Sequence, residues 1–197
     1  MVLAGGRAER LGGADKAALD VDGTSLIERA LAAVAEARQV VVVGDERPTS
    51  LAVTWVREQP AYGGPVAATY AALDALMRGS PVQMTGDDGR MTGQTHGTTP
   101  VVVLAVDMPD VTAGTVRRLL DGVAGRDGAV LVDGGRRHLA LAVRRAALER
   151  ARPEPTTGAA MRDLWSALDL AEVPAVGEEA HDVDRWSDLG PTRDPRG

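Results

Sequence analysis

The stretch from Val101 to Pro109 reads VVVLAVDMP. Six consecutive apolar residues of this kind are typical of a strand that is buried on both faces of a parallel sheet. The strand ends at Asp107, so a carboxylate directly follows it. In open α/β sheets, ligands bind beyond the carboxyl ends of the strands. The position of Asp107 therefore indicates a side chain that faces a ligand.

Strand and helix patterns alternate on either side of this stretch. Ser25-Leu26-Ile27-Glu28 has the form of a capping box and predicts a helix that runs to about Ala37. Further strands are predicted at 40–43, 53–56, 129–132 and 139–143, the last two as a hairpin around residues 133–135, and further helices at 65–77, 112–124, 144–151 and 158–168. This alternation predicts a doubly wound, Rossmann-like α/β fold with a mixed, mostly parallel sheet.

The pattern occupies residues 1–190 and indicates a single domain. Residues 79–99 are rich in Gly, Thr, Asp and Gln and have no periodicity, so they predict a flexible insertion. Residues 191–197 are expected to form a frayed C-terminal tail. The first strand has almost no residues ahead of Leu3, whereas central strands usually have about five or six, and we therefore expect a start site further upstream.

Composition excludes several classes of protein. The 197-residue chain has no cysteine, which rules out disulfides, zinc–thiolate sites and thiol catalysis. Its net charge of −6 argues against general binding of nucleic acids. The apolar runs are too short to cross a membrane and no signal peptide is evident, so a cytoplasmic protein is expected. Lys16 is the sole lysine beside 21 arginines, which favours a specific need for a compact ammonium.

Lys16 ends a glycine-rich segment that begins at Leu3-Ala4-Gly5-Gly6 and continues through Arg10. Glycines allow the backbone to approach a ligand and to direct N–H groups toward it. The nearby cations add positive charge, so the segment is suited to a polyphosphate. Its spacing matches neither a Walker A loop nor a dinucleotide-binding fingerprint.

Two later segments are candidates for the same site. Gly63-Gly64-Pro65, which follows Gln59, opens a helix and would permit close backbone contact with a flat ligand. Asp182-Val183-Asp184 would place two carboxylates on one face of an extended segment. An ordinary helix entry and a solvated turn explain these segments equally well. His138, which lies next to Arg136 and Arg137, and Arg162 could contact a substrate phosphate. These two residues and His96 are more simply interpreted as surface residues.

The glycine-rich segment and Asp-Met-Pro together resemble the molybdenum cofactor guanylyltransferase family, within the wider group of sugar-phosphate and cytidylyl transferases. The matching positions are Gly5, Gly6, Arg10, Gly12, Asp15, Lys16 and Asp107. The resemblance implies transfer of GMP from GTP to molybdopterin, with release of pyrophosphate. It implies that Asp107 binds Mg²⁺ with help from Asp184, and that Lys16 and Arg10 balance the pyrophosphate charge. It also implies nucleotide contacts from Leu3, Ala4, Gly5, Gly6, Lys16, Gln59, Gly63, Gly64, Pro65 and Asp107.

Two alternatives remain open from the sequence. One is a related cytidylyltransferase or sugar-1-phosphate nucleotidyltransferase, although the short chain has no added sugar-binding domain. The other is a non-catalytic nucleotide-binding protein, which the presence of both Lys16 and Asp107 disfavours. The expected partners are the nucleotide, a phosphorylated acceptor and, transiently, other proteins of cofactor biosynthesis, with no nucleic acid and no membrane.

Overall fold

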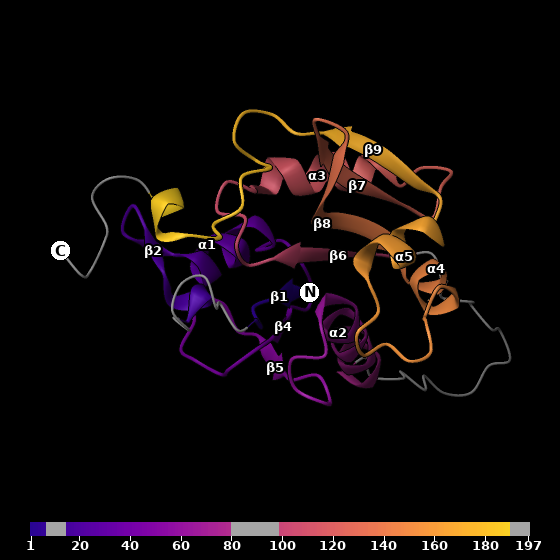
Figure 1. Ribbon diagram of the computed structural model, residues 1–197, viewed down its shortest axis with the longest axis horizontal. Coiled ribbons are helices and arrows are strands. Elements are labelled where there is room, and N and C mark those ends of the chain that lie inside the picture. The colour runs from indigo at the N-terminus through magenta and orange to yellow at the C-terminus, as the bar shows by residue number, and fades with distance from the viewer. Residues whose placement is uncertain (7–14, 80–98, 190–197) are drawn as a thin grey trace, which may run out of the picture.

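The computed structural model describes residues 1–6, 15–79 and 99–189. Seven strands form its main sheet: β1 (Val2–Leu3), β4 (Val41–Val43), β5 (Thr54–Val56), β6 (Pro100–Ala105), β7 (Gly128–Asp133), β8 (Arg136–Arg144) and β9 (Leu170–Pro174). Their order is β5-β4-β1-β6-β8-β7-β9 (Figure 1). β8 is antiparallel to both of its neighbours, and all other adjacent strands are parallel. The predicted mixed, mostly parallel sheet is therefore confirmed.

The helices are α1 (Leu26–Ala33), α2 (Pro65–Gly79), α3 (Ala113–Gly122), α4 (Arg145–Arg150) and α5 (Met161–Ser166). Two short 3-10 turns, η2 (Lys16–Ala18) and η3 (Trp186–Leu189), and a hairpin of β2 (Asp20–Val21) and β3 (Thr24–Ser25) complete the described elements. Among these elements, no helix has the length and apolar character needed to cross a bilayer.

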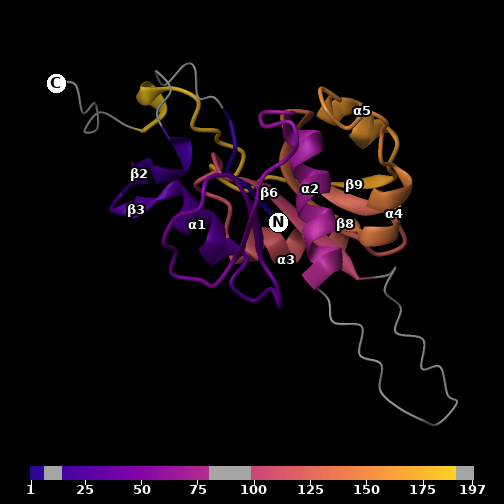
Figure 2. The ribbon, with the colours of Figure 1, turned by 90° about the horizontal axis from the view of Figure 1, so that it is seen from below.

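The core has two layers, one on each face of the sheet. α1 and α3 cover one face, and α2, α4 and α5 cover the other, where α2 and α5 lie side by side (Figure 2). Successive residues of β4 belong to alternate layers, because Val42 packs with the first and Val41 and Val43 with the second. All three valines are fully buried. This explains why a continuous apolar run, rather than an alternating one, encodes the strand.

Helix starts show how far the local sequence determines the structure. Thr112 caps α3 as predicted, and it forms a reciprocal capping box with Thr115. The capping box predicted at Ser25 is wrong, since its side chain makes no capping hydrogen bond. The Glu28 carboxylate instead accepts hydrogen bonds from the backbone and side chain of Ser50. α1 also ends at Ala33, earlier than the expected Ala37.

The remaining elements agree with the prediction to within a few residues, with three exceptions. The β2–β3 hairpin, β9 and the 3-10 turns were not expected. The hairpin between β7 and β8 turns at Gly134 and Gly135, which both have positive φ, a conformation that glycine adopts without strain. Except for Gly79 and Thr99, the predicted insertion lies outside the described residues, as does the predicted tail.

Candidate functional site

The predicted site residues converge at the carboxyl edge of the sheet. Gly5 and Gly6 follow β1, and Asp107 follows the adjacent strand β6. The Lys16 ammonium lies 2.8 Å from Asp107 Oδ2 and 2.8 Å from Asp184 Oδ1. Three residues that are distant in sequence therefore meet around one positive charge.

Rigid neighbours position each of these three side chains. Lys16 begins η2, and the next residue, Ala17, is fully buried in the core. The backbone N–H of the buried residue Val183 donates to the carbonyl oxygen of Asp107 at 2.8 Å, which fixes the C-terminal segment against the end of β6. The backbone N–H of Asp184 in turn donates to the Asp188 carboxylate at 2.9 Å.

The electrostatics of the site favour a charged lysine. Burial alone would lower the pKa of Lys16, but the neighbouring carboxylates of Asp107 and Asp184 outweigh it and raise the pKa. Burial and repulsion by Asp107 and Asp184 raise the pKa of Asp182, although His138 and Arg136 partly oppose this. The site therefore concentrates negative charge that a cation must balance.

A pocket of about 360 Å³ opens beside these residues. Seven of the expected nucleotide contacts line it, namely Leu3, Gly5, Gly6, Lys16, Gly64, Pro65 and Asp107. Ala4, Gln59 and Gly63 are not among its lining residues, and Arg10 and Gly12 lie outside the described residues. The pocket therefore joins the glycine-rich segment, Asp107 and the start of α2 in one cavity.

The loop before α2 is shaped by two glycines. Gly64 has a φ of 95°, which a side chain would strain, and its carbonyl oxygen accepts a hydrogen bond from Ala68 N–H in the first turn of α2. A Cβ atom on Gly63 would approach Ala67 Cβ to 2.9 Å. A residue outside the loop also fixes its position, since the Gly158 N–H donates to the Gly63 carbonyl oxygen at 2.8 Å. Both glycines are therefore required by the local geometry.

Glu58 is a pocket residue that is not among the predicted nucleotide contacts, although it lies next to Gln59 in the same segment. Its side chain is buried at the pocket wall, and Oε1 accepts a hydrogen bond of 2.9 Å from the Tyr62 backbone N–H. The neighbouring Gln59, which was the predicted contact, is exposed. A signal was present, because Glu58 follows β5 closely, and the end of β5 lies at the same edge of the sheet as Asp107.

His138 differs from its expected place on the surface. It lies in β8 with a side chain that is only 5% exposed, and its Nδ1 is 3.8 Å from Asp182 Oδ1. The Arg136 guanidinium also contacts Asp182, at 3.3 Å. Arg162 is exposed, as expected, and His96 lies outside the described residues.

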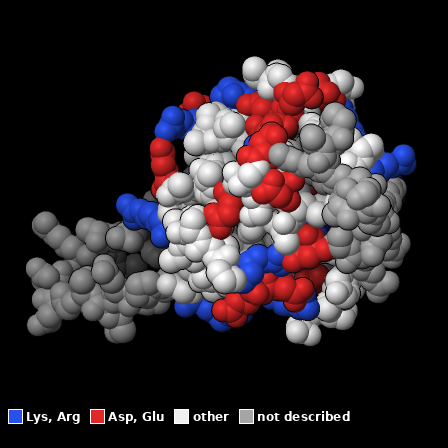
Figure 3. Space-filling view, turned by 90° about the vertical axis from the view of Figure 1, so that its left-hand side faces the viewer, with Lys and Arg blue, Asp and Glu red and all other residues white. Residues whose placement is uncertain are grey.

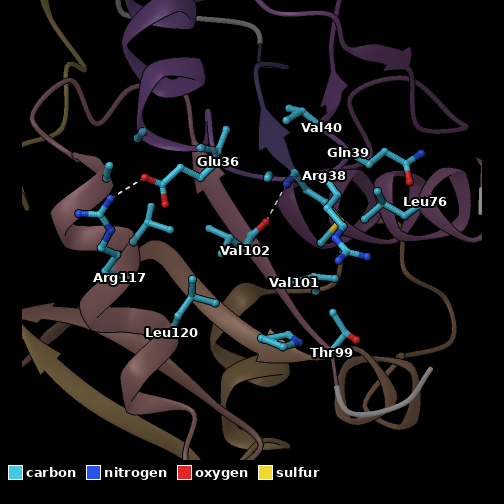
Figure 4. Close-up of a pocket in the computed structure, with 17 residues that line it drawn as sticks. Glu36, Arg38, Gln39, Val40, Leu76, Thr99, Val101, Val102, Arg117 and Leu120 are labelled. Atoms are coloured by element: carbon cyan, nitrogen blue, oxygen red, sulfur yellow. Dashed lines mark hydrogen bonds and ion pairs between the residues drawn. The ribbon is translucent and has the colours of Figure 1, made fainter. Parts of the chain in front are cut away.

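A second cavity of about 370 Å³ lies at the other end of β1 (Figure 4). Its lining is mainly apolar, as at Val102 and Leu120, and includes the Glu36–Arg117 ion pair. The Met1 amino group donates to the Val102 carbonyl oxygen at 2.7 Å inside it. Among the described residues that line this cavity, no arrangement is comparable to the lysine and two aspartates beside the first pocket.

Acidic side chains form a band across the face of the molecule shown in Figure 3. Together with the net charge of −6, this indicates that an anionic ligand must rely on local cations rather than on the overall field. In the described part of the chain, no three His, Asp or Glu side chains are arranged to hold a metal ion by themselves.

Comparisons with solved structures show the same fold. Molybdopterin-guanine dinucleotide biosynthesis protein A from Archaeoglobus fulgidus is 19% identical, with a TM-score of 0.65 over 95% of this chain and 93% of that one. The 2-C-methyl-D-erythritol 4-phosphate cytidylyltransferase from Thermus thermophilus is 22% identical, with a TM-score of 0.66 over 95% and 94%. Rv0371c from Mycobacterium tuberculosis, solved with manganese, is 18% identical, with a TM-score of 0.60 over 95% and 92%.

No curated protein sequence matches the chain at a significant level. The family comparison is informative, because the MobA-like NTP transferase domain matches residues 1–172. The match includes the glycine-rich segment, Lys16 and Asp107, whereas Asp182 and Asp184 lie beyond it. With this match over most of its length and the nucleotidyltransferase fold, the chain belongs to the MobA-like NTP transferase family.

Proposed function

We propose that this nucleotidyltransferase transfers GMP from GTP to molybdopterin in a magnesium-dependent reaction that releases pyrophosphate. The observation that carries this proposal is the contact of Lys16 with Asp107 and Asp184 at the mouth of a pocket that Gly5 and Gly6 also line. Such a site combines carboxylates, an ammonium and accessible backbone at one point. Those are the groups that phosphoryl and nucleotidyl transfer use for positioning and charge neutralisation.

Asp107 and Asp184 fit the requirements of a divalent cation. Their oxygens converge on one positive charge, and Mg²⁺ prefers oxygen ligands from one or two carboxylates together with substrate phosphates. When bound, Mg²⁺ would supply charge neutralisation at the triphosphate. The absence of a three-residue metal cluster among the described residues agrees with ligands shared between protein and nucleotide.

The protein residues have separate roles in the proposed reaction. Backbone N–H groups near Gly5 and Gly6 hold the phosphates, and Lys16 turns from the carboxylates toward the departing pyrophosphate. Arg10, which lies outside the described residues, is proposed to support Lys16 there. A terminal phosphate of the acceptor attacks the α-phosphorus of GTP, the bond to pyrophosphate breaks, and no protein nucleophile is needed.

Glu58 favours guanine over adenine and cytosine. Its carboxylate is buried in the pocket wall, close to Gly5 and the loop before α2. A carboxylate only accepts hydrogen bonds, and guanine presents the N1–H and N2–H donors side by side. Adenine has an acceptor at N1, and cytosine offers a single amino group on that edge. A cytidylyltransferase is the second candidate, because structures of that activity share this fold.

The test is a direct transfer assay with purified protein. GTP, CTP, ATP and UTP are each incubated with Mg²⁺ and molybdopterin, and released pyrophosphate and the dinucleotide product are quantified. We expect product with GTP, none without Mg²⁺, and none with Asp107→Asn. Product with CTP alone would instead assign the cytidylyl reaction, and tight nucleotide binding without any product would indicate the non-catalytic alternative.

A further inference from the structure

The two sides of Asp107 are built differently. Strand order places β1, which leads to Gly5 and Gly6, on one side of β6, and β8 on the other. Lys16 contacts Asp107 at 2.8 Å, and it lines the same pocket as Gly5 and Gly6. The register between β6 and β8 pairs Leu104 with Ala140, so His138, two residues earlier in β8, lies beside Val106. The start of β8 therefore reaches the same edge as Asp107, on the side of β6 away from β1.

On this second side lies a cluster of His138, Asp182 and Arg136. Asp182 is central, since it lies 3.8 Å from His138 Nδ1 and 3.3 Å from the Arg136 guanidinium. His138 Nδ1 is fully buried and has no hydrogen-bond partner among the described residues. Leaving a buried polar atom without a partner costs free energy, so its placement against Asp182 needs a reason beyond packing.

The chemistry of the proposed reaction provides that reason. In nucleotidyl transfer, the attacking and leaving oxygens lie roughly in line with the phosphorus between them. If Lys16 and the glycine-rich segment hold the pyrophosphate, the attacking phosphate must approach from the opposite side of Asp107. A phosphate monoester carries close to two negative charges and needs a cation there.

We propose that Arg136 binds the terminal phosphate of the acceptor, and that His138 and Asp182 are positioning residues for it. The Arg136 side chain is 74% exposed, so its guanidinium is accessible to a ligand, while the Asp182 carboxylate holds it at the edge of the site. His138 supports Asp182 from the buried side. The ligand class is a phosphate monoester. This inference rests on the proposed function and adds the acceptor subsite to it.

Arg137 offers a matched control. It is the next residue in the same strand, but its guanidinium pairs with Glu172 on β9, away from Asp182. Arg136→Gln should raise the KM for molybdopterin about tenfold and leave the KM for GTP unchanged, whereas Arg137→Gln should change neither. An equal effect of the two substitutions, or a rise in the KM for GTP, would overturn the assignment.

A binding measurement separates this inference from the proposed function. The protein is saturated with Mg²⁺ and a non-hydrolysable GTP analogue, and binding of phenyl phosphate is followed by ³¹P NMR. Binding that Arg136→Gln abolishes and Arg137→Gln preserves would support the subsite even if molybdopterin were not the acceptor. Transfer to molybdopterin that Arg136→Gln leaves intact would refute the subsite and leave the proposed function standing.

The positioning role has its own test. His138→Leu and Asp182→Asn should each raise the KM for the acceptor several-fold with little change in kcat, and the double variant should match the single variants. His138→Gln, which keeps a hydrogen-bond donor, should restore most of the affinity. Additive effects, or a lower KM in Asp182→Asn, would show that His138 does not act through Asp182. Should His138→Leu fail to fold, the Gln and Asn variants still decide the question.

Discussion

Lys16 and Asp107 are in direct contact, with Nζ 2.8 Å from Oδ2, although 91 positions separate them in the sequence. The same ammonium also contacts Asp184. Lys16 therefore occupies the place between two carboxylates where a divalent cation would bind. In the proposed reaction, the lysine and the metal would compete for this place until a phosphate attracts the lysine.

This competition predicts the effect of Lys16→Met on metal binding. Without nucleotide, the variant should bind Mn²⁺ more tightly than the wild type, because the two carboxylates lose their internal counter-ion. Electron paramagnetic resonance of free Mn²⁺ would measure the change. Arg47→Gln, which removes a cation that pairs with Asp15 instead, is the control and should have little effect. Weaker Mn²⁺ binding in Lys16→Met would contradict the competition.

Loss of the Lys16 ammonium should strengthen Mn²⁺ binding but lower turnover. Lys16→Ala should lower kcat by about 10²- to 10³-fold, the range for loss of one preorganised charge-stabilising group. The fold should be preserved, since Lys16 lies at the rim of the pocket rather than in the core. Circular dichroism and a transfer assay would check both points, and turnover close to that of the wild type would remove Lys16 from the catalytic machinery.

The two metal-site aspartates should differ in importance. Asp107→Asn should abolish Mg²⁺-dependent turnover, because Asp107 lies two residues beyond the end of β6 and lines the pocket. Asp184→Asn should be milder, since an amide oxygen still coordinates Mg²⁺ and the Asp184 side chain is more exposed. Activity measured across a Mg²⁺ titration would rank the two, and equal loss in both variants would reverse this order.

Base selection should depend on Glu58. Glu58→Gln replaces one acceptor oxygen with a donor amide, so GTP should lose about tenfold or more in kcat/KM, equivalent to about 1.4 kcal/mol. ATP should lose little. Gln59→Glu is the matched control, because Gln59 is exposed and does not line the pocket. A GTP preference that survives Glu58→Gln would place base recognition elsewhere.

Glu179 should make the stability depend on pH. Burial alone would raise its pKa, but hydrogen bonds from Thr115, the Val176 backbone and Arg118 together lower it below 4.5. The stabilisation is therefore present above pH 4.5 and is lost as the pH falls through the lower, folded-state pKa. Glu179→Gln should cost about 2 kcal/mol at pH 7 and less at low pH. Denaturation in urea would test this, with the exposed Glu178→Gln as control.

Local patterns predicted those features that depend on a strand and the residue after it. The buried run of β6 predicted both the strand and the position of Asp107 at the carboxyl edge of the sheet, where Asp107 and Lys16 line the pocket. Glu58 was missed because its burial depends on the course of the loop up to Tyr62 rather than on periodicity. The capping box predicted at Ser25 does not form. The Glu28 carboxylate instead accepts a hydrogen bond from Ser50, which lies 22 residues further along the chain.

β9 illustrates a second limit. Its sequence, LAEVP, has an alternating pattern too short to distinguish it from a loop. Its pairing with β7 depends on a partner more than 40 positions earlier in the chain. The local sequence also did not predict the burial of His138, since its neighbours Arg136 and Arg137 are charged. In both cases the outcome is determined by packing between distant segments.

The contact between Lys16 and Asp184 spans 168 positions, and this separation has a consequence during synthesis. Most of the sheet can pair before the last segment leaves the ribosome, yet Asp184 can reach Lys16 only after that. A nascent chain that ends before Asp182 would carry the glycine-rich segment and Asp107 without their final partner. The contribution of Asp184 to the proposed metal site is therefore delayed until the C-terminal segment has left the ribosome, so this long-range contact forms after the rest of the site.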